Sequence, residues 1–251
     1  MIGTFINVAA ILIGGSLGLL FGGRLPERLK TTVIAGMGLF TAVTGIKMFL
    51  ETQNSLFVLG GLVIGALLGE WWKIEDGLQH LGEIIERRFN RPDHSIPSGD
   101  SALSGDSAPS RDFAPSGDFI RGFMTASLLF CIGPMAILGS IQAGLTGDYS
   151  LLIIKSVLDG FAAMAFASTL GVGVLFSAAM ILLYQGAITL LAAQLNAIVT
   201  KPMMAELTAT GGVLLLGIAI SSLLEIKKIR VGNLLPALAI APLIVWIVSL
   251  F

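Results

Sequence analysis

Long apolar stretches separated by short polar segments are the feature that most constrains the fold of this chain. A helix needs roughly 20 mostly apolar residues to cross about 30 Å of hydrocarbon. Hydrophobic residues make up 55% of the chain, above the roughly 45–50% usual in soluble domains. We therefore predict an all-α fold, a polytopic bundle of about eight transmembrane helices. The expected spans are residues 2–22, 31–50, 55–72, 119–140, 150–169, 172–194, 209–226 and 233–250.

The distribution of Lys and Arg predicts how these spans are oriented. Positively charged residues are retained on the cytoplasmic side of membrane proteins. With both termini outside, 12 of the 15 basic residues fall on the inner side. The three near the outer side are Lys47, Lys155 and Lys201. We therefore predict that the N-terminus and the C-terminus both lie outside, which requires an even number of spans.

One polar stretch divides the chain into three parts. Residues 1–72 hold the first three spans, residues 119–251 hold the last five, and residues 73–118 between them are predicted to be cytoplasmic. Within residues 73–90, apolar side chains recur at helical spacing opposite Glu and Arg, which is typical of an amphipathic helix on a membrane surface. Beyond it, three Ser-Gly-Asp repeats with few apolar residues predict a flexible, disordered linker.

Two stripes of glycine predict where helices pack closely. Glycine at every fourth position gives a helix a smooth face for backbone contact, a glycine zipper. The stripes are Gly14, Gly18 and Gly22 in the first span and Gly61, Gly65 and Gly69 in the third. Packing within one chain and contact in a homo-oligomer both remain open from the sequence. Gly-Gly pairs in the first, third and seventh spans raise the hypothesis that the first three and last three spans are inverted copies.

Asp159 is the main candidate for a functional residue because it lies inside the fifth span. A carboxylate in the membrane costs about 3 kcal/mol on insertion scales and usually has a partner or a task. Lys155 lies four residues earlier on the same helical face, so an ion pair between them is the structural alternative. The other candidates for transport or binding are uncharged polar residues. They are Asn7, Ser168, Ser177, Gln185 and Asn233.

Two features predict irregular helices. Gly133 and Pro134 lie near the middle of the fourth span, where Pro removes a backbone hydrogen bond and Gly lets the chain bend. We therefore predict a kink there, with a role in gating. The join between the fifth and sixth spans, at residues 169–174, is short, so a re-entrant pair is an alternative at that point.

The sequence carries no pattern of an enzyme active site. It has no phosphate-binding loop, no paired Cys or His at metal-ligand spacing, and no set of Ser, His and carboxylate within the spans. The net charge of −1 provides no basic surface for nucleic acid. We therefore predict no catalysis, no metal or other cofactor, and no nucleic-acid partner.

Four segments carry a resemblance to a known family. They read MIGTFINVAAILIGGSLGLLFG, KSVLDGFAAMAFASTLGVGVLFS, YQGAITLLA, and ATGG followed by IRVGNLLPAL. In these segments the chain resembles the bacterial inner-membrane family typified by YqgA and YdfK. The resemblance covers nearly the whole chain apart from the Ser-Gly-Asp linker. It implies a multi-pass protein of the bacterial plasma (inner) membrane, in a family without an assigned biochemical function, and it supplies no site residues.

Two hypotheses for function follow. In the first, the chain is a secondary transporter or channel for a small solute or ion. Asp159 would bind a cation or proton, Gln185 and Asn7 would hold the solute, and the kink in the fourth span would allow gating. In the second, the chain is a non-transporting membrane scaffold or sensor whose residues 73–90 bind a cytoplasmic partner. A water-accessible path to Asp159 favours the first hypothesis, and a dry core favours the second.

Overall fold

Helices are the only regular elements in the residues that the computed structural model describes, which are 1–22, 26–89 and 117–250. The α-helices are α1 (Ile2–Gly22), α2 (Glu27–Phe49), α3 (Ser55–Trp72), α4 (Ile74–Phe89), α5 (Gly117–Cys131), α6 (Pro134–Thr146), α7 (Ser150–Leu170), α8 (Gly173–Leu190), α9 (Ala192–Ile198), α10 (Lys201–Ile218) and α11 (Ala237–Val248). A π-helical turn, η1 (Ala219–Leu223), extends α10, and a 3₁₀ turn, η2 (Val231–Leu234), precedes α11. The all-α prediction is confirmed. The predicted linker falls, as far as residue 116, outside the described residues.

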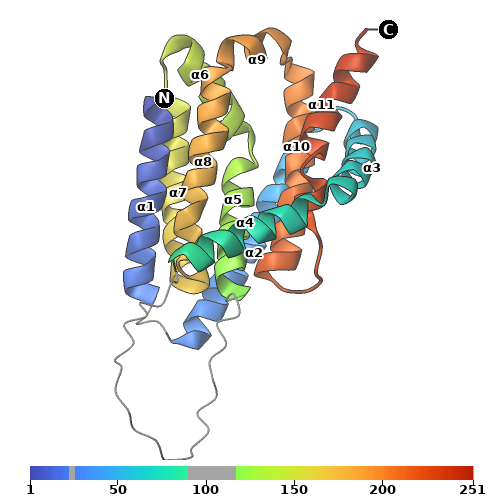
Figure 1. Cartoon of the computed structure of the whole chain (residues 1–251). Helices are drawn as coiled ribbons and strands as arrows, with labels where there is room; N and C mark the ends of the chain where they lie inside the picture. Colours follow the sequence, from blue (N-terminus) through green and yellow to red (C-terminus); the bar gives the residue numbers. More distant parts are fainter. Residues whose placement is uncertain (23–25, 90–116, 251) are drawn as a thin grey trace, which may run out of the picture.

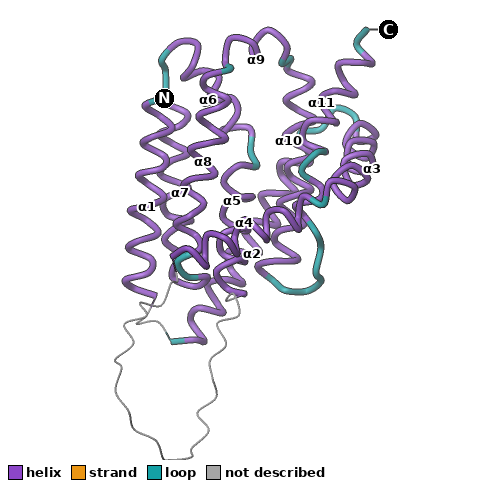
Figure 2. Tube along the Cα trace, in the orientation of Figure 1, coloured by secondary structure: helices purple, strands orange, loops and turns teal. Residues whose placement is uncertain are grey.

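Seven helical segments of the described residues are long and apolar enough to cross a membrane, if α10 is counted with η1 and η2 with α11. The pair α5 and α6 makes an eighth if the two are counted as one span. These two helices are bent by 59° at their junction, which Figure 2 shows as a short loop. Gly133 precedes α6 and Pro134 lies in its first turn. The predicted kink is therefore present. By contrast, α7 and α8 are each long and apolar enough to cross a membrane, so the tight join at Gly171 connects two membrane-length helices.

The sixth and seventh spans differ most from the prediction. The predicted span 209–226 is wrong at its start, because α10 begins at Lys201. Thr200 caps this helix by accepting a backbone N–H hydrogen bond of 3.4 Å, and Pro202 lies in the first turn. Both residues are typical of a helix start. The sixth span ends at Leu190, earlier than predicted, and the chain continues into the short helix α9.

Lengthwise pairs of helices build the bundle. The helix α1 packs along α7, α2 along α10, α3 along α11, and α5 with α6 along α8. In the first pair, Gly14, Gly18 and Gly22 lie against backbone atoms of Gly160, Met164 and Ser168, in that order. The two helices therefore run parallel, and their backbones approach closely because no Cβ separates them.

The second glycine stripe faces α11 in the reverse order. Here Gly61, Gly65 and Gly69 lie against Ala241, Ala237 and Asn233. These two helices therefore run antiparallel. Each stripe is covered by another helix of the same chain, which is the packing alternative of the two that the sequence left open.

The helix α4 crosses the side of the bundle (Figure 1) and packs against α5 and η2. Its packing face includes Gly82 and buries Glu75 and Glu86. Leu81 and Ile84, which the sequence pattern assigns to the apolar face, are exposed. Leu78 of the apolar face does pack against the core, so the packing face is offset from the apolar face and overlaps it in part. Glu75 lies against η2, to which it donates and from which it accepts hydrogen bonds. The position of this helix at the inner leaflet stays a prediction.

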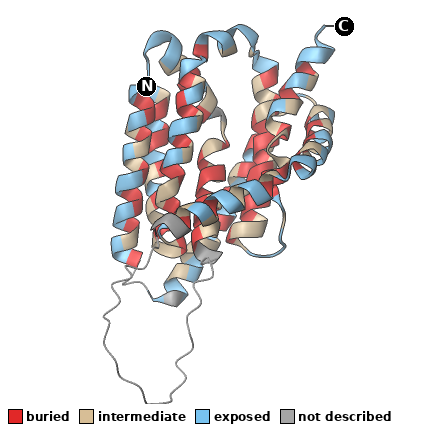
Figure 3. Ribbon diagram, viewed as in Figure 1, coloured by how far each residue is buried: buried red, intermediate tan, exposed pale blue. Residues whose placement is uncertain are grey.

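Large apolar side chains cover much of the outer surface of the spans, and Figure 3 shows the exposed residues along α1 and α3. Leu20, Phe40 and Trp71 are each more than two-thirds exposed. Such a surface is ordinary in lipid and would drive association in water. The chain is accordingly a membrane protein with multiple apolar helices. The start of α1 and the end of α11 lie at the same end of the bundle (Figure 1), and which side of the membrane that end faces stays a prediction.

Candidate functional site

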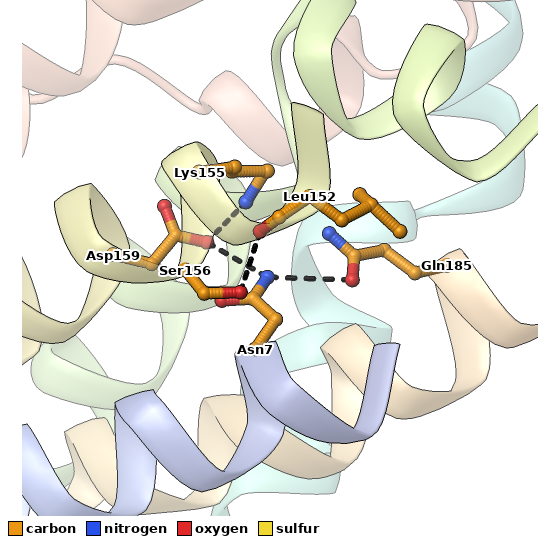
Figure 4. Close-up of polar contacts among 6 residues, drawn as sticks. All are labelled: Asn7, Leu152, Lys155, Ser156, Asp159 and Gln185. Atoms are coloured by element: carbon orange, nitrogen blue, oxygen red, sulfur yellow. Dashed lines mark hydrogen bonds and ion pairs between the residues drawn. The ribbon is translucent and has the colours of Figure 1, made fainter. Parts of the chain in front are cut away.

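The middle of α7 carries an ion pair that is almost completely buried. Lys155 and Asp159 are one helical turn apart, and the Lys155 ammonium contacts Asp159 Oδ2 (Figure 4). Lys155 is 6% exposed and Asp159 is 8% exposed. The pairing that the sequence suggested as the structural alternative is therefore present, and the surroundings of the pair decide whether it has a further role.

Asn7 of α1 joins this pair to α8. Its Nδ2 donates to Asp159 Oδ2 at 3.0 Å and to Gln185 Oε1 at 3.3 Å. Asn7 and Gln185 are both 0% exposed. The close contact between the backbones of α1 and α7 brings this short side chain within reach of the carboxylate. Three helices thus assemble what we call the central polar cluster, consisting of Asn7, Lys155, Asp159 and Gln185 (Figure 4).

The central polar cluster contains hydrogen-bonding atoms that have no partner among the described residues. They are Asn7 Oδ1, an acceptor, and Gln185 Nε2, a donor. Thr4 Oγ1 on α1 and Ser140 Oγ on α6 are also buried without a partner. Leaving such a group unsatisfied costs about 1–3 kcal/mol. Buried polar groups without a protein partner are commonly satisfied by bound water or by a ligand.

A pocket of about 670 Å³ borders the cluster between α2, the α5–α6 break and α7. Lys155 and Asp159 line this pocket together with Lys47 and Glu51, which lie at the C-terminal end of α2. Gly133 of the break also lines it, and most of the remaining lining is apolar. The volume lies within the range of small-molecule sites, about 300–1,000 Å³. We call this the charged pocket.

A second pocket, of about 710 Å³, lies against another face of the broken helix. Its lining is almost wholly apolar and includes Ser127, Cys131 and Tyr184. Ile132 lines both pockets. The break between α5 and α6 is therefore part of the wall that separates the apolar pocket from the charged pocket.

The family of this chain follows from comparison with known sequences. Residues 2–246 match the family described as "Protein of unknown function (DUF554)". This chain belongs to the DUF554 family. The family membership expected from the four resembling segments is thereby confirmed.

Two relatives show how fully the DUF554 resemblance extends. The uncharacterized protein YqgA of Escherichia coli (strain K12) is 34% identical over 241 residues, covering 96% of this chain and 94% of the relative. The uncharacterized membrane protein YdfK of Bacillus subtilis (strain 168) is 29% identical over 255 residues, covering 100% of this chain and 98% of the relative. No solved structure gives a significant match. The relatives therefore support a membrane protein and assign no site.

Three polar residues predicted as candidates in this DUF554 protein lie away from the central polar cluster. Ser168 and Ser177 donate to carbonyls of their own helices, at 2.8 Å and 2.7 Å. Each lies more than two helical turns along its helix from the cluster residue on that helix. Asn233 lies in η2, where its Oδ1 accepts a hydrogen bond from the Glu75 N–H at 2.7 Å. The structure thus gives these three residues local partners.

Glu206 of α10 is a second buried carboxylate, which the sequence pattern did not identify as a candidate. This residue is 1% exposed. It accepts three hydrogen bonds from the turn between α2 and α3: from Thr52 Oγ1 at 2.6 Å, Gln53 N at 2.8 Å and Asn54 N at 2.9 Å. The observed helix α10 begins at Lys201 and places this glutamate inside the bundle. A seventh span predicted to start that early would have identified Glu206 as a buried residue.

The central polar cluster offers one ammonium, one carboxylate and two amides. Within the described ranges, no group of three or more His, Cys, Asp or Glu side chains is placed to hold a metal ion. The donors and acceptors of the cluster suit a small polar or charged solute, which they can bind by hydrogen bonds and by charge.

Proposed function

We propose that this chain is a secondary transporter or channel for a small solute or ion in the bacterial plasma (inner) membrane, with Asp159 as its central binding residue. One observation carries the proposal. The central polar cluster is buried in a bundle of membrane-length helices, has unpartnered polar atoms, and borders a pocket of about 670 Å³. Ionisable residues inside membrane helices usually mark the path of a substrate or ion.

The depth of the ion pair supports this role. The helix α7 runs from Ser150 to Leu170, and Asp159 lies near its midpoint. Replacing a buried ion pair by apolar residues is often neutral or stabilising, so stability alone is a weak reason for such a pair. Its place in the wall of a pocket gives it a second possible use, which is to exchange its internal partner for a solute.

The break between α5 and α6 supports gating. Helix ends leave backbone N–H and C=O groups without helical partners, and interrupted helices near the membrane midplane often form binding sites in transporters. Gly133 lines the charged pocket, and Ile132 lies between the two pockets. A movement of α6 relative to α5 would change the wall that separates them.

The pairing of helices supports a transporter built from inverted repeats. Counting α5 with α6 as the fourth span, the pairs are first with fifth, second with seventh, third with eighth, and fourth with sixth. One exchange of spans maps these pairs onto one another. It replaces the first span by the sixth, the second by the seventh, the third by the eighth and the fourth by the fifth, and the reverse. Many secondary transporters consist of repeats with inverted topology.

Reconstituted protein tests the proposal. Liposomes loaded with a pH dye would compare cation-driven and solute-driven fluxes of the wild type and Asp159→Asn at equal reconstitution. We expect the flux to fall by about tenfold or more, which corresponds to about 1.4 kcal/mol, because the variant lacks the buried charge. The matched control is Glu83→Gln, which neutralises a carboxylate on α4 away from the charged pocket and should keep the wild-type flux.

Two outcomes would contradict the proposal. One is the absence of flux over a broad panel of cations and solutes. The other is an equal flux in the wild type and in Asp159→Asn, with both proteins folded according to their size-exclusion profiles and melting temperatures.

The rival hypothesis is a non-transporting scaffold or sensor. Its support is α4, whose exposed Leu81 and Ile84 offer an apolar surface to a cytoplasmic partner or to the inner leaflet. Thiol labelling separates the two hypotheses in a chain whose native thiol is removed by Cys131→Ala. If water fills the charged pocket, a membrane-impermeant reagent labels Thr44→Cys in the pocket wall, whereas a dry core leaves it unlabelled. Neither hypothesis includes catalysis, a cofactor or nucleic-acid binding.

A further inference from the structure

We propose that the charged pocket binds a small zwitterion with an apolar or aromatic side chain, which is the chemistry of a free hydrophobic α-amino acid. This inference rests on the proposed function, because it names the class of solute for the same site. It is carried by the balance of charge in the pocket, by the unsatisfied atoms of the central polar cluster, and by the apolar lining.

The charged side chains that line the pocket, among the residues described, balance one another. They form two pairs in which a lysine precedes an acid by four residues: Lys47 with Glu51, and Lys155 with Asp159. A solute with a net charge would leave that charge uncompensated in a low-dielectric site, which is strongly unfavourable. A zwitterion brings one charge of each sign and leaves the total unchanged.

The buried pair provides a partner for each end of such a solute. Lys155 and Asn7 both contact the same carboxylate oxygen, Asp159 Oδ2. The other oxygen, Oδ1, takes part in neither contact and can accept from a solute ammonium. The Lys155 ammonium can in turn donate to a solute carboxylate, since an ammonium has three N–H donors.

The unpartnered amide atoms have the same two polarities. Gln185 Nε2 is a donor, Asn7 Oδ1 is an acceptor, and both side chains are completely buried. Figure 4 shows the two amides converging with Lys155 and Asp159 from α1, α7 and α8. A carboxylate requires donors and an ammonium requires acceptors, so the free amide atoms match both ends of a zwitterion. Neither amide lines the charged pocket, so a bridging water molecule would connect each of them to the solute.

The remaining lining fits an apolar side chain. It includes Met37, Phe40, Met48, Phe130 and Phe166. Methionine and phenylalanine side chains form adaptable apolar surfaces. An alkali cation would leave this part of the pocket unused, whereas the side chain of leucine or phenylalanine would bury apolar area against it.

The same pair of charges occurs in the headgroup of phosphatidylethanolamine. We assign the pocket to the free amino acid because the ion pair lies near the middle of the membrane-length helix α7, whereas a lipid headgroup resides at the interface near the helix ends. Lys47 and Glu51 lie at the C-terminal end of α2, where a water-soluble zwitterion would enter.

Isothermal titration calorimetry on the purified full-length protein in detergent tests the assignment. The probes are L-leucine and L-phenylalanine, together with two analogues that each lack one charge, isocaproic acid and isoamylamine. We expect leucine to bind and each analogue to bind about tenfold or more weakly by comparison. Glycerophosphoethanolamine is the soluble probe for a lipid headgroup, and it should not bind more tightly than leucine.

Variants link the binding to the pair. Asp159→Asn and Lys155→Met should each lose leucine binding, while Glu83→Gln should keep it. The double variant Lys155→Asp with Asp159→Lys retains one charge of each sign, so it should recover part of the leucine binding. Melting temperatures without solute establish that each variant is folded, and the analogue series on the wild type does not depend on any variant folding.

The outcomes separate this inference from the proposed function. Equal affinities for leucine and both analogues, or no binding of either amino acid, would overturn the zwitterion assignment. A cation flux that Asp159→Asn abolishes would then leave the transport proposal standing. Tighter binding of glycerophosphoethanolamine than of leucine would overturn the free amino acid as the occupant. Leucine binding without flux of any solute would support the zwitterion site and contradict transport.

Discussion

Two buried carboxylates, Asp159 of α7 and Glu206 of α10, differ in how their surroundings satisfy them. Glu206 accepts three hydrogen bonds from a single turn of the same chain. Asp159 shares one oxygen between an ammonium and an amide, lines a pocket, and has neighbours with unpartnered atoms. The comparison teaches that burial alone does not identify a functional carboxylate, because both are buried. Incomplete satisfaction beside a pocket does distinguish the two.

The role of Glu206 follows from the turn that it holds. Asn54 is the N-cap of α3, and its side chain accepts from the Leu56 N–H at 3.1 Å. Glu206 accepts from the backbone N–H of the same residue and of Gln53. This carboxylate therefore ties the start of α3 to α10, and we assign it a structural role.

Removing one partner of the ion pair should have the largest effect. Lys155→Met should lower the free energy of unfolding by about 3–5 kcal/mol, because it leaves the Asp159 charge buried and unpaired. The double variant Lys155→Met with Asp159→Leu should return to within about 1 kcal/mol of the wild type. Both are measured by unfolding in mixed detergent micelles. If the double variant were as unstable as the single one, the pair would be structural and the contrast with Glu206 would fail.

Glu206→Ala should have the next largest effect, a loss of about 2–4 kcal/mol, since it removes the three hydrogen bonds that the carboxylate accepts from the part-buried turn, and a typical hydrogen bond contributes about 0.5–1.5 kcal/mol. The matched control is Glu51→Ala, which removes an exposed carboxylate next to the same turn and should change stability by about 0.5 kcal/mol or less. Thermal unfolding in detergent measures both. Equal melting temperatures for the two variants would show that the turn does not depend on Glu206.

Gly18→Ala tests how the central polar cluster is positioned. A Cβ at Gly18 would clash with backbone atoms of Met164, and overpacking of this kind typically costs about 1–3 kcal/mol. We expect the variant to push α1 away from α7 and to weaken the contact of Asn7 with the carboxylate, so flux should fall along with stability. Gly77→Ala on α4 is the control, because nothing lies within 4 Å of a Cβ there and Gly77 does not line the charged pocket. A wild-type melting temperature for Gly18→Ala would contradict the close packing of α1 and α7.

Glu75 on α4 is a third buried carboxylate and should show the smallest effect. Burial raises its pKa above the usual 4.5, and the hydrogen bond from the Gly232 N–H opposes that rise. Because the folded-state pKa is raised, the contribution of this group to α4 docking is complete below about pH 4.5 and declines as pH increases through the raised pKa.

Hydrogen exchange measures this pH dependence. Protection of the α4 amides in the wild type, corrected for intrinsic exchange rates, should decrease as the pH increases from about 4.5 through the raised pKa of Glu75. Glu75→Gln keeps an acceptor for the Gly232 N–H and removes the charge, so its protection should stay level. A wild-type profile in the variant would place the pH dependence on another group.

Much of the fold could be predicted, because the free energy of placing a segment in lipid depends on its own residues. The positions of the first three spans and of the fifth follow directly from their apolar lengths. The predicted start of the seventh span was wrong, because the first turns of α10 contain Lys201 and Glu206, whose polarity resembles that of a loop. The packing face of α4 was also not evident, since Glu75 is held by partners in η2, far along the chain.

The sequence by itself determined that this chain is a bundle of membrane-length helices, with a charged pair one turn apart on α7 and a break before Pro134. Only the tertiary structure decided which polar residues share a site. Asn7 reaches Asp159 and Gln185 across separations of 152 and 178 residues, while Ser168 and Ser177 bond to their own helices. The physical reason is that transfer into lipid is a local property of a segment, whereas a hydrogen bond in the core depends on which helices pack side by side.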